Sequence, residues 1–195
     1  PLHTGKNIWS SAIDDGRCAT GGADGAIALL LSVAKIPRTF EIDNTLLHGS
    51  LPDHSNDSYK SYAFVSPDTL VATTASGRIV ALTLSQDGTS SLEVHESHES
   101  LRTFSTVIGA SGVAFVAGIG GHVVMYSLRA RRCFPVAEVS GKVAGMFSSE
   151  QTRDTNHSAP ERLSLLVASV GSTMAQLLDI CTVTEQEKGR AFNST

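Results

Sequence analysis

A glycine-centred turn between two apolar runs recurs four times along the 195 residues of this chain. The turn glycines are Gly25, Gly77, Gly121 and Gly171, which lie 52, 44 and 50 residues apart. Asp24 precedes the first glycine, and Asp-Gly between apolar runs is a strong hairpin signal because both residues tolerate the positive φ of a tight turn. Repeats of about 40 to 50 residues that are built from short strands are typical of propeller blades.

Each repeat contains enough apolar and alternating segments for four antiparallel strands. One apolar run precedes the turn glycine, a second follows it, and a further strand is predicted upstream. Polar alternation, as in Leu92-Glu93-Val94-His95, is typical of a half-exposed outer strand. The sequence therefore predicts an all-β fold, namely a β-propeller fragment of about four blades of four antiparallel strands. The predicted blades span roughly residues 3–42, 59–95, 101–137 and 139–185, as parts of one propeller over residues 1–195.

The same alignment of the repeats gives the strand boundaries in the second half of the chain. First strands are predicted at 101–108 and 139–147, and the last two strands of the fourth blade at 173–179 and near 182–185. The polar segments 43–58 and 148–161 are predicted to be exposed loops. A closed ring typically needs more blades, and the chain begins with Pro1 instead of Met, so we expect it to be a fragment of a longer protein. An open arc of blades would leave two sheet edges exposed.

Composition and charge argue against several classes of function. The formal net charge of -4 gives no overall attraction to nucleic acid, so any such contact needs a local basic patch. No apolar run approaches the roughly 20 residues of a membrane-spanning helix, so no membrane partner is expected. Cys18, Cys133 and Cys181 are too few and too far apart for a disulfide framework. Buried, reduced thiols predict an intracellular, cytoplasmic protein.

The first repeat resembles a known family. It opens with His-x-Gly, continues with Asn-Ile-Trp-Ser on the first strand, and has Thr-Gly-Gly-Ala-Asp-Gly-x-Ile at the hairpin. The positions that carry the resemblance are His3, Gly5, Lys6, Asn7, Ile8, Trp9, Ser10, Thr20, Gly21, Gly22, Ala23, Asp24, Gly25 and Ile27. They look like the corresponding positions of WD-repeat propellers. More narrowly, they are similar to the family of WD-repeat protein 6 and its fungal counterpart, the regulatory subunit of a tRNA 2'-O-methyltransferase.

What this resemblance implies is a non-catalytic scaffold that takes part in tRNA processing. Its partner would be an FtsJ-type methyltransferase that methylates the ribose of the wobble nucleotide of certain tRNAs, and tRNA itself would be a further contact. The S-adenosylmethionine site would belong to the partner, so neither a catalytic residue nor a cofactor is expected in this chain. The alternative is a generic protein-interaction WD-repeat scaffold, for trafficking or ubiquitin-ligase assembly, with no role in RNA.

The chain also departs from the general WD pattern. The Trp-Asp dipeptide that ends the third strand of a WD repeat is absent from all four units. In WD repeats, that Trp joins a His, a Ser or Thr, and an Asp in a buried hydrogen-bonded set. Here His3, Thr20 and Asp24 supply three members of the set, and only in the first repeat. The other repeats are therefore expected to depend on apolar packing.

Most chemically suggestive motifs have a structural interpretation. Asp24 is interpreted as a turn residue and Trp9 as packing between blades. His95 and His98 are disfavoured as zinc ligands because such a site needs three or four ligands and none follows at a useful spacing. The glycines around Gly120 lie between two strands, whereas a phosphate-binding loop requires a following helix. No Gly-x-Ser-x-Gly elbow is present. We therefore predict no metal site and no enzyme.

One basic motif is not explained by the predicted fold. It consists of Arg129, Arg131 and Arg132. They are predicted to lie in a loop before the outer strand of the third repeat. An ordinary solvated turn is the favoured interpretation. The functional alternative is a contact with RNA phosphate or with an acidic partner surface, because guanidinium groups bind such oxygens in a bidentate manner.

Overall fold

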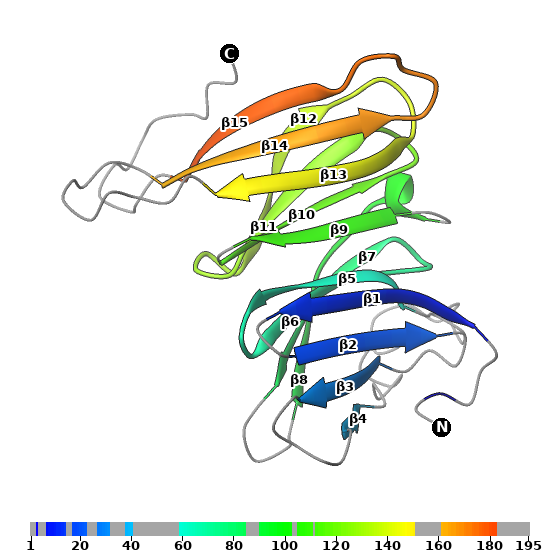
Figure 1. Cartoon of the computed structure of the whole chain (residues 1–195), viewed down its shortest axis with the longest axis vertical. Helices are drawn as coiled ribbons and strands as arrows, with labels where there is room; N and C mark the ends of the chain where they lie inside the picture. Colours follow the sequence, from blue (N-terminus) through cyan, green and yellow to red (C-terminus); the bar gives the residue numbers. More distant parts are fainter. Residues whose placement is uncertain are drawn as a thin grey trace.

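The computed structural model describes residues 3, 7–14, 17–22, 27–31, 38–40, 59–84, 90–102, 105–110, 112–150 and 161–182. Within these residues the chain forms four antiparallel sheets and one short 3-10 helix, η1 (Glu99–Leu101). The predicted all-β fold is confirmed, and the arrangement of the sheets is propeller-like (Figure 1).

The strands follow one another in chain order within every sheet. The first sheet contains β1 (Ile8–Asp14), β2 (Arg17–Gly22), β3 (Ile27–Leu31) and β4 (Arg38–Phe40). The second contains β5 (Tyr59–Ser66), β6 (Thr69–Thr74), β7 (Arg78–Leu84) and β8 (Ser90–Ser97). The third contains β9 (Ser105–Ala110), β10 (Val113–Gly118), β11 (His122–Ser127) and β12 (Arg132–Glu138). The fourth contains β13 (Val143–Glu150), β14 (Glu161–Ser169) and β15 (Gln176–Thr182).

The four sheets are stacked in sequence order, with the first and fourth at opposite ends of the stack (Figure 1). Their first strands meet: β1 contacts β5, β5 contacts β9, and β9 contacts β13. This is the arrangement expected when successive blades place their inner strands side by side.

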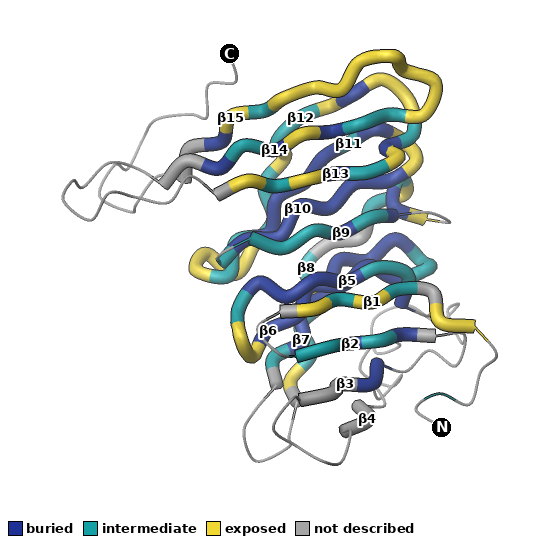
Figure 2. Tube along the Cα trace, in the orientation of Figure 1, coloured by how far each residue is buried: buried dark blue, intermediate teal, exposed yellow. Residues whose placement is uncertain are grey.

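Three apolar cores hold the stack together, one at each junction between sheets. The core between the first and second sheets includes Ala19, Ile27, Tyr62, Phe64, Leu70 and Val80. The core between the second and third includes Val71, Ile79, Val107, Ala114, Val116 and Tyr126. The core between the third and fourth includes Phe115, Val123, Met125, Met146, Leu165 and Val167. Every residue of β6 and β10 is buried, because these strands are covered on both faces (Figure 2).

Two of the repeat glycines are required at their turns. Gly77 and Gly121 have φ values of +83° and +78°, which only glycine adopts readily. A Cβ atom at either position would also overlap a backbone carbonyl, of His98 and Val139 respectively. Each carbonyl belongs to the segment that leads into the next sheet, so these glycines allow consecutive blades to approach closely.

Gly171 does not occupy the equivalent position. Its φ is +80°, but a Cβ atom there would meet nothing within 4 Å. The turn bonds that run from Gly77 N to Thr74 O and from Gly121 N to Gly118 O correspond in the fourth sheet to Ser172 N to Ser169 O. The fourth hairpin is also longer, so the strand predicted over 173–179 begins only at Gln176 and continues to Thr182 as β15.

Other boundaries shift for local reasons. The segment predicted as a strand over 101–108 instead starts with η1, and β9 begins only at Ser105. The strand predicted over 139–147 begins at Val143 and continues to Glu150, and β14 begins at Glu161. Residues 148–150 and 161 of the predicted loop are therefore in strands, and residues 151–160 lie outside the described residues. The predicted loop 43–58 lies outside the described residues, as do positions 183–185 of the predicted fourth outer strand; Thr182 ends β15.

Hydrogen bonds supplement the apolar cores at the first two junctions. The Tyr62 hydroxyl of β5 donates to the Ser10 carbonyl of β1. Between the second and third sheets, Val107 N donates to Ser61 Oγ over 3.0 Å, and the hydroxyls of Thr73 and Ser105 are 2.5 Å apart in a buried position. Since a buried hydroxyl without a partner is costly, such pairs favour one alignment of the sheets.

The turn between β5 and β6 gives a prediction about pH. The hydroxyls of Ser66 and Thr69 donate to Asp68 Oδ1 over 2.5 and 3.2 Å, and the Ser66 bond is the main cause of a lowered pKa for Asp68. Because the folded state favours the carboxylate, its stabilisation is present above the ordinary pKa of about 4 and is lost as the pH falls through the lowered value. Asp68→Ala should therefore reduce the free energy of unfolding at pH 7 by no more than about 1 kcal/mol, since the carboxylate is exposed.

Denaturant unfolding at pH 7 and pH 2 measures this effect. The difference between wild type and Asp68→Ala should shrink at pH 2. Asp68→Asn keeps an acceptor oxygen but does not titrate, so the contribution of Asp68 to the pH dependence of stability should be absent from this variant as well. If wild type and Asp68→Ala differ in free energy of unfolding by the same amount at both pH values, the lowered pKa of Asp68 does not stabilise the fold.

Candidate functional site

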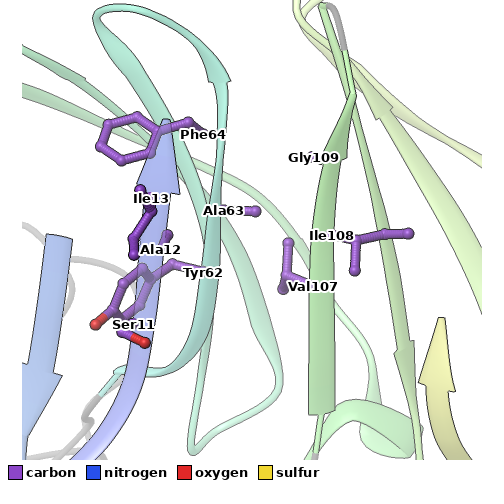
Figure 3. Close-up of a pocket in the computed structure, with 9 residues that line it drawn as sticks. All are labelled: Ser11, Ala12, Ile13, Tyr62, Ala63, Phe64, Val107, Ile108 and Gly109. Atoms are coloured by element: carbon purple, nitrogen blue, oxygen red, sulfur yellow. The ribbon is translucent and has the colours of Figure 1, made fainter. Parts of the chain in front are cut away.

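An open groove runs across the first strands of three sheets. Its volume is about 280 Å³, and β1, β5 and β9 each contribute three consecutive residues (Figure 3). The lining residues are Ser11, Ala12, Ile13, Tyr62, Ala63, Phe64, Val107, Ile108 and Gly109. The groove exists because the first strands of consecutive blades lie side by side, so its residues come from three separate repeats.

The groove is suited to binding more than to proton transfer. Tyr62 is its one titratable residue, and burial raises the pKa of this phenol well above its usual value. The phenol therefore stays protonated at neutral pH and donates to the Ser10 carbonyl. Apolar side chains such as Ile13, which is 79% exposed, offer contact area to an apolar segment of a partner.

The three arginines lie at the turn from β11 to β12, and all three are exposed. Arg131 has a φ of 50° and forms an ion pair with Glu93 of β8, with a second bond from Nε to Glu93 Oε2 over 3.2 Å. Glu93 also lies 3.6 Å from His95 Nε2. The charge of Arg131 is thus partly offset within the chain, and its side chain links the turn to the second sheet.

Arg132 and Arg129 differ from Arg131 in their surroundings. The Arg132 guanidinium lies 4.5 Å from the centre of the Phe134 ring, in a cation–π contact that leaves much of its edge accessible. Arg129 is exposed at the start of the turn. An anionic partner would therefore meet the Arg132 guanidinium more readily than that of Arg131, which is paired with Glu93.

His95 and His98 take different neighbours. The His95 ring lies 4.7 Å from that of Tyr126, whereas the His98 ring lies 5.1 Å from that of His122. His98 Nδ1 is 2.7 Å from Ser100 Oγ. No cluster of three or more metal-ligating side chains was found within the described ranges. Sequence reasoning missed the contact between His98 and His122 because the two residues belong to different sheet segments with no shared motif.

The hydrogen-bonded set expected in the first repeat is described only in part. His3 Nε2 lies 3.0 Å from Thr20 Oγ1, which joins the segment before β1 to β2. Asp24 and Gly25 lie outside the described residues, as does the side chain of Trp9. The full set and the packing of Trp9 between blades therefore stay predictions.

Two further expectations concern thiols and membranes. Cys18 and Cys133 are half-buried and take part in no disulfide, while the Cys181 side chain is outside the described part of the chain. Among the residues that the structure describes, no helix has the length and apolar character needed to cross a bilayer.

Comparison with known proteins gives structural matches only. No family model matches the chain, and no curated protein matches its sequence. Among solved structures, the computationally designed Ika4 protein is similar at 12% identity with a TM-score of 0.55, over 90% of this chain and 91% of that one. The designed Ika8 protein is similar at 11% identity with a TM-score of 0.52, over 84% of this chain and 43% of that one. At these identities the likeness concerns the fold alone.

Proposed function

We propose that this chain is part of a non-catalytic WD-repeat scaffold that binds an FtsJ-type methyltransferase and supports 2'-O-methylation of the tRNA wobble nucleotide. The observation that carries the proposal is the resemblance of residues 3–27 to that family. The bond between His3 and Thr20 supports it, because these are two of the residues that a WD repeat joins.

The scaffold role is supported by the way the surfaces are built. The stack of sheets holds short turns and first strands on a rigid support, which is where binding residues usually lie. The groove across β1, β5 and β9 offers apolar contact area without an acid–base pair. The turn between β11 and β12 adds three exposed arginines, of which Arg131 is paired with Glu93. Such surfaces suit a protein partner together with a charged nucleic-acid backbone.

Co-purification tests the proposal directly. The protein is tagged in its source cells, and the co-purifying proteins and RNAs are identified. We expect a methyltransferase of the FtsJ type and tRNA, and we expect wobble ribose methylation to fall when the gene is deleted. Unchanged wobble methylation after deletion would contradict the tRNA role.

The arginine turn gives a second, separable prediction. Replacing Arg129, Arg131 and Arg132 with Ala should weaken tRNA binding by about tenfold and reduce its salt dependence, because phosphate contacts release counterions. The matched control removes three positive charges elsewhere, by changing Lys60, Arg102 and Lys142 to Ala. The dissociation constants for tRNA are measured by filter binding. If the two variants bind tRNA with the same affinity, the arginines at this turn contribute no more than other positive charges and the prediction is wrong.

The second candidate function is a protein-interaction scaffold with no role in RNA. It is favoured by the pairing of Arg131 with Glu93, which lowers the positive charge that the turn offers to phosphate. Under this alternative, co-purification yields a protein partner without tRNA. The Arg129/Arg131/Arg132 variant would then weaken capture of that protein and leave tRNA methylation unchanged.

A further inference from the structure

Glu93 of β8 lies against the guanidinium edge of Arg131, in the arginine turn between β11 and β12. The Nη2 atom of Arg131 forms an ion pair with Glu93 Oε1, and its Nε donates to Glu93 Oε2 over 3.2 Å. Two parallel contacts of this kind make the fork in which arginine binds a carboxylate or a phosphate group. The carboxylate of Glu93 therefore occupies the edge that a phosphate ligand of Arg131 would use.

Sheet register and turn conformation bring these two residues together. Glu93 pairs with Ala81 of β7, which is buried in the core between the second and third sheets, so the Glu93 side chain is on the face toward the third sheet. Arg131 has a φ of 50°, which is uncommon for a residue other than glycine, in a turn where Ala130 N donates to Ser127 Oγ. The contact is thus a feature of the junction between two repeats.

The contact is also reversible, because both side chains reach water. The Glu93 side chain is 37% exposed and that of Arg131 is 64% exposed. Ion pairs at such exposed positions contribute little to stability, since water screens the charges and both side chains lose freedom. An anion that gains a further contact nearby can therefore displace the carboxylate.

Arg132 supplies the further contact. Its guanidinium is held 4.5 Å from the centre of the Phe134 ring, and stacking of this kind uses the flat face and leaves the N–H edge for a ligand. A nucleic-acid strand carries phosphates in series, so it can contact two neighbouring arginines at once. With Glu93 in place, the edge of Arg131 is occupied, and the negative carboxylate repels an approaching phosphate.

We propose that Glu93 is an internal competitor that limits the binding of RNA phosphate at the arginine turn and is displaced when Arg131 takes part in binding. The inference rests on the proposed contact between this turn and tRNA, and it adds how that contact is restrained. Glu93 makes no contact with RNA itself. It lowers the affinity by taking the place of the ligand.

Filter-binding titrations with tRNA test the proposal. Glu93→Gln should lower the dissociation constant about fivefold, which corresponds to the upper range for an exposed ion pair, and should steepen the salt dependence by about one phosphate contact. The matched control is Glu99→Gln, which removes the same charge from an exposed ion pair with Arg102, 4.0 Å long and outside the arginine turn. It should leave the dissociation constant within about twofold of wild type. Both glutamates are accessible to water and Gln has nearly the same size, so both variants should keep the circular dichroism spectrum of wild type.

A double variant shows whether the gain in affinity passes through Arg131. When Arg131 is already Ala, Glu93→Gln should tighten binding by less than about twofold, because no guanidinium is left to release. A gain of the same size in both backgrounds means that Glu93 acts only through its charge, and the proposal is then wrong. It is also overturned if Glu93→Gln gains no more affinity than Glu99→Gln, or if neither wild type nor Glu93→Gln binds tRNA. The scaffold role is judged separately, by wobble methylation after gene deletion, and a fall in methylation would uphold that role even where these titrations exclude Glu93 as a competitor.

Discussion

Phe115→Ala should destabilise the chain by about 3 to 5 kcal/mol, the range measured when a buried aromatic ring is removed from a core. Phe115 is fully buried in the centre of β10, where it packs in the core between the third and fourth sheets. The loss includes the transfer of the ring from the core and the cavity that remains. β10 is hydrogen-bonded to β9 and β11 on its two sides, so the backbone has little freedom to collapse into that cavity.

Urea denaturation measures this change, and a surface truncation supplies the comparison. Met174→Ala removes a large side chain that is 79% exposed, so it should change the free energy of unfolding by less than about 0.5 kcal/mol. Phe115→Leu should fall between the two variants because it retains much of the volume. Similar midpoints for Phe115→Ala and wild type would show that the third and fourth sheets do not share this core.

Gly109→Ala should cost about 3 kcal/mol, near the upper end of the range for overpacked interiors. Gly109 lies on β9, where the third sheet meets β5 of the second. A Cβ atom at this position would overlap the backbone carbonyl of Phe64, and it would also reach the Ala63 side chain. A carbonyl cannot rotate out of the way as a side chain can, so the two sheets must move apart. That movement would open the core between them and distort the groove.

The control for Gly109 is another strand glycine with more space. Gly145→Ala on β13 would place its Cβ atom at an ordinary contact distance of 3.8 Å from the Phe147 ring. It should change stability by less than about 1 kcal/mol, because Ala loses less conformational freedom on folding than Gly. If both variants unfold at the same urea concentration, the close approach of β9 to β5 does not exist in solution.

Sequence reasoning succeeded where the signal is local. Turn glycines such as Gly77 and Gly121 are visible because their backbone conformation excludes most other residues, and apolar runs such as that in β10 are visible because both faces are covered. The prediction that Gly171 occupies the same turn position failed, because a longer hairpin moves the turn relative to the strands. The residue pattern around Gly171 resembles that of the other repeats, so only the pairing of β14 with β15 shows that the hairpin is longer.

Contacts between repeats could not be predicted from the sequence, because the residues that meet are far apart along the chain. Nothing near Arg131 in the chain indicates that Glu93 neutralises it, because the two residues meet only when the second and third sheets stack. The groove residues are spread over three repeats, and Gly109 has no turn signature. Its importance comes from the Phe64 carbonyl, which lies in another blade.

The sequence by itself determined that this protein is a series of similar β units, since hairpin turns and strand alternation depend on neighbouring residues and their intrinsic backbone preferences. The tertiary structure decided which faces of those units meet, which charges are paired, and which apolar side chains remain exposed. Those outcomes depend on pairing register and on distances between residues of different repeats, and a one-residue change in a hairpin reverses which side chains a strand presents.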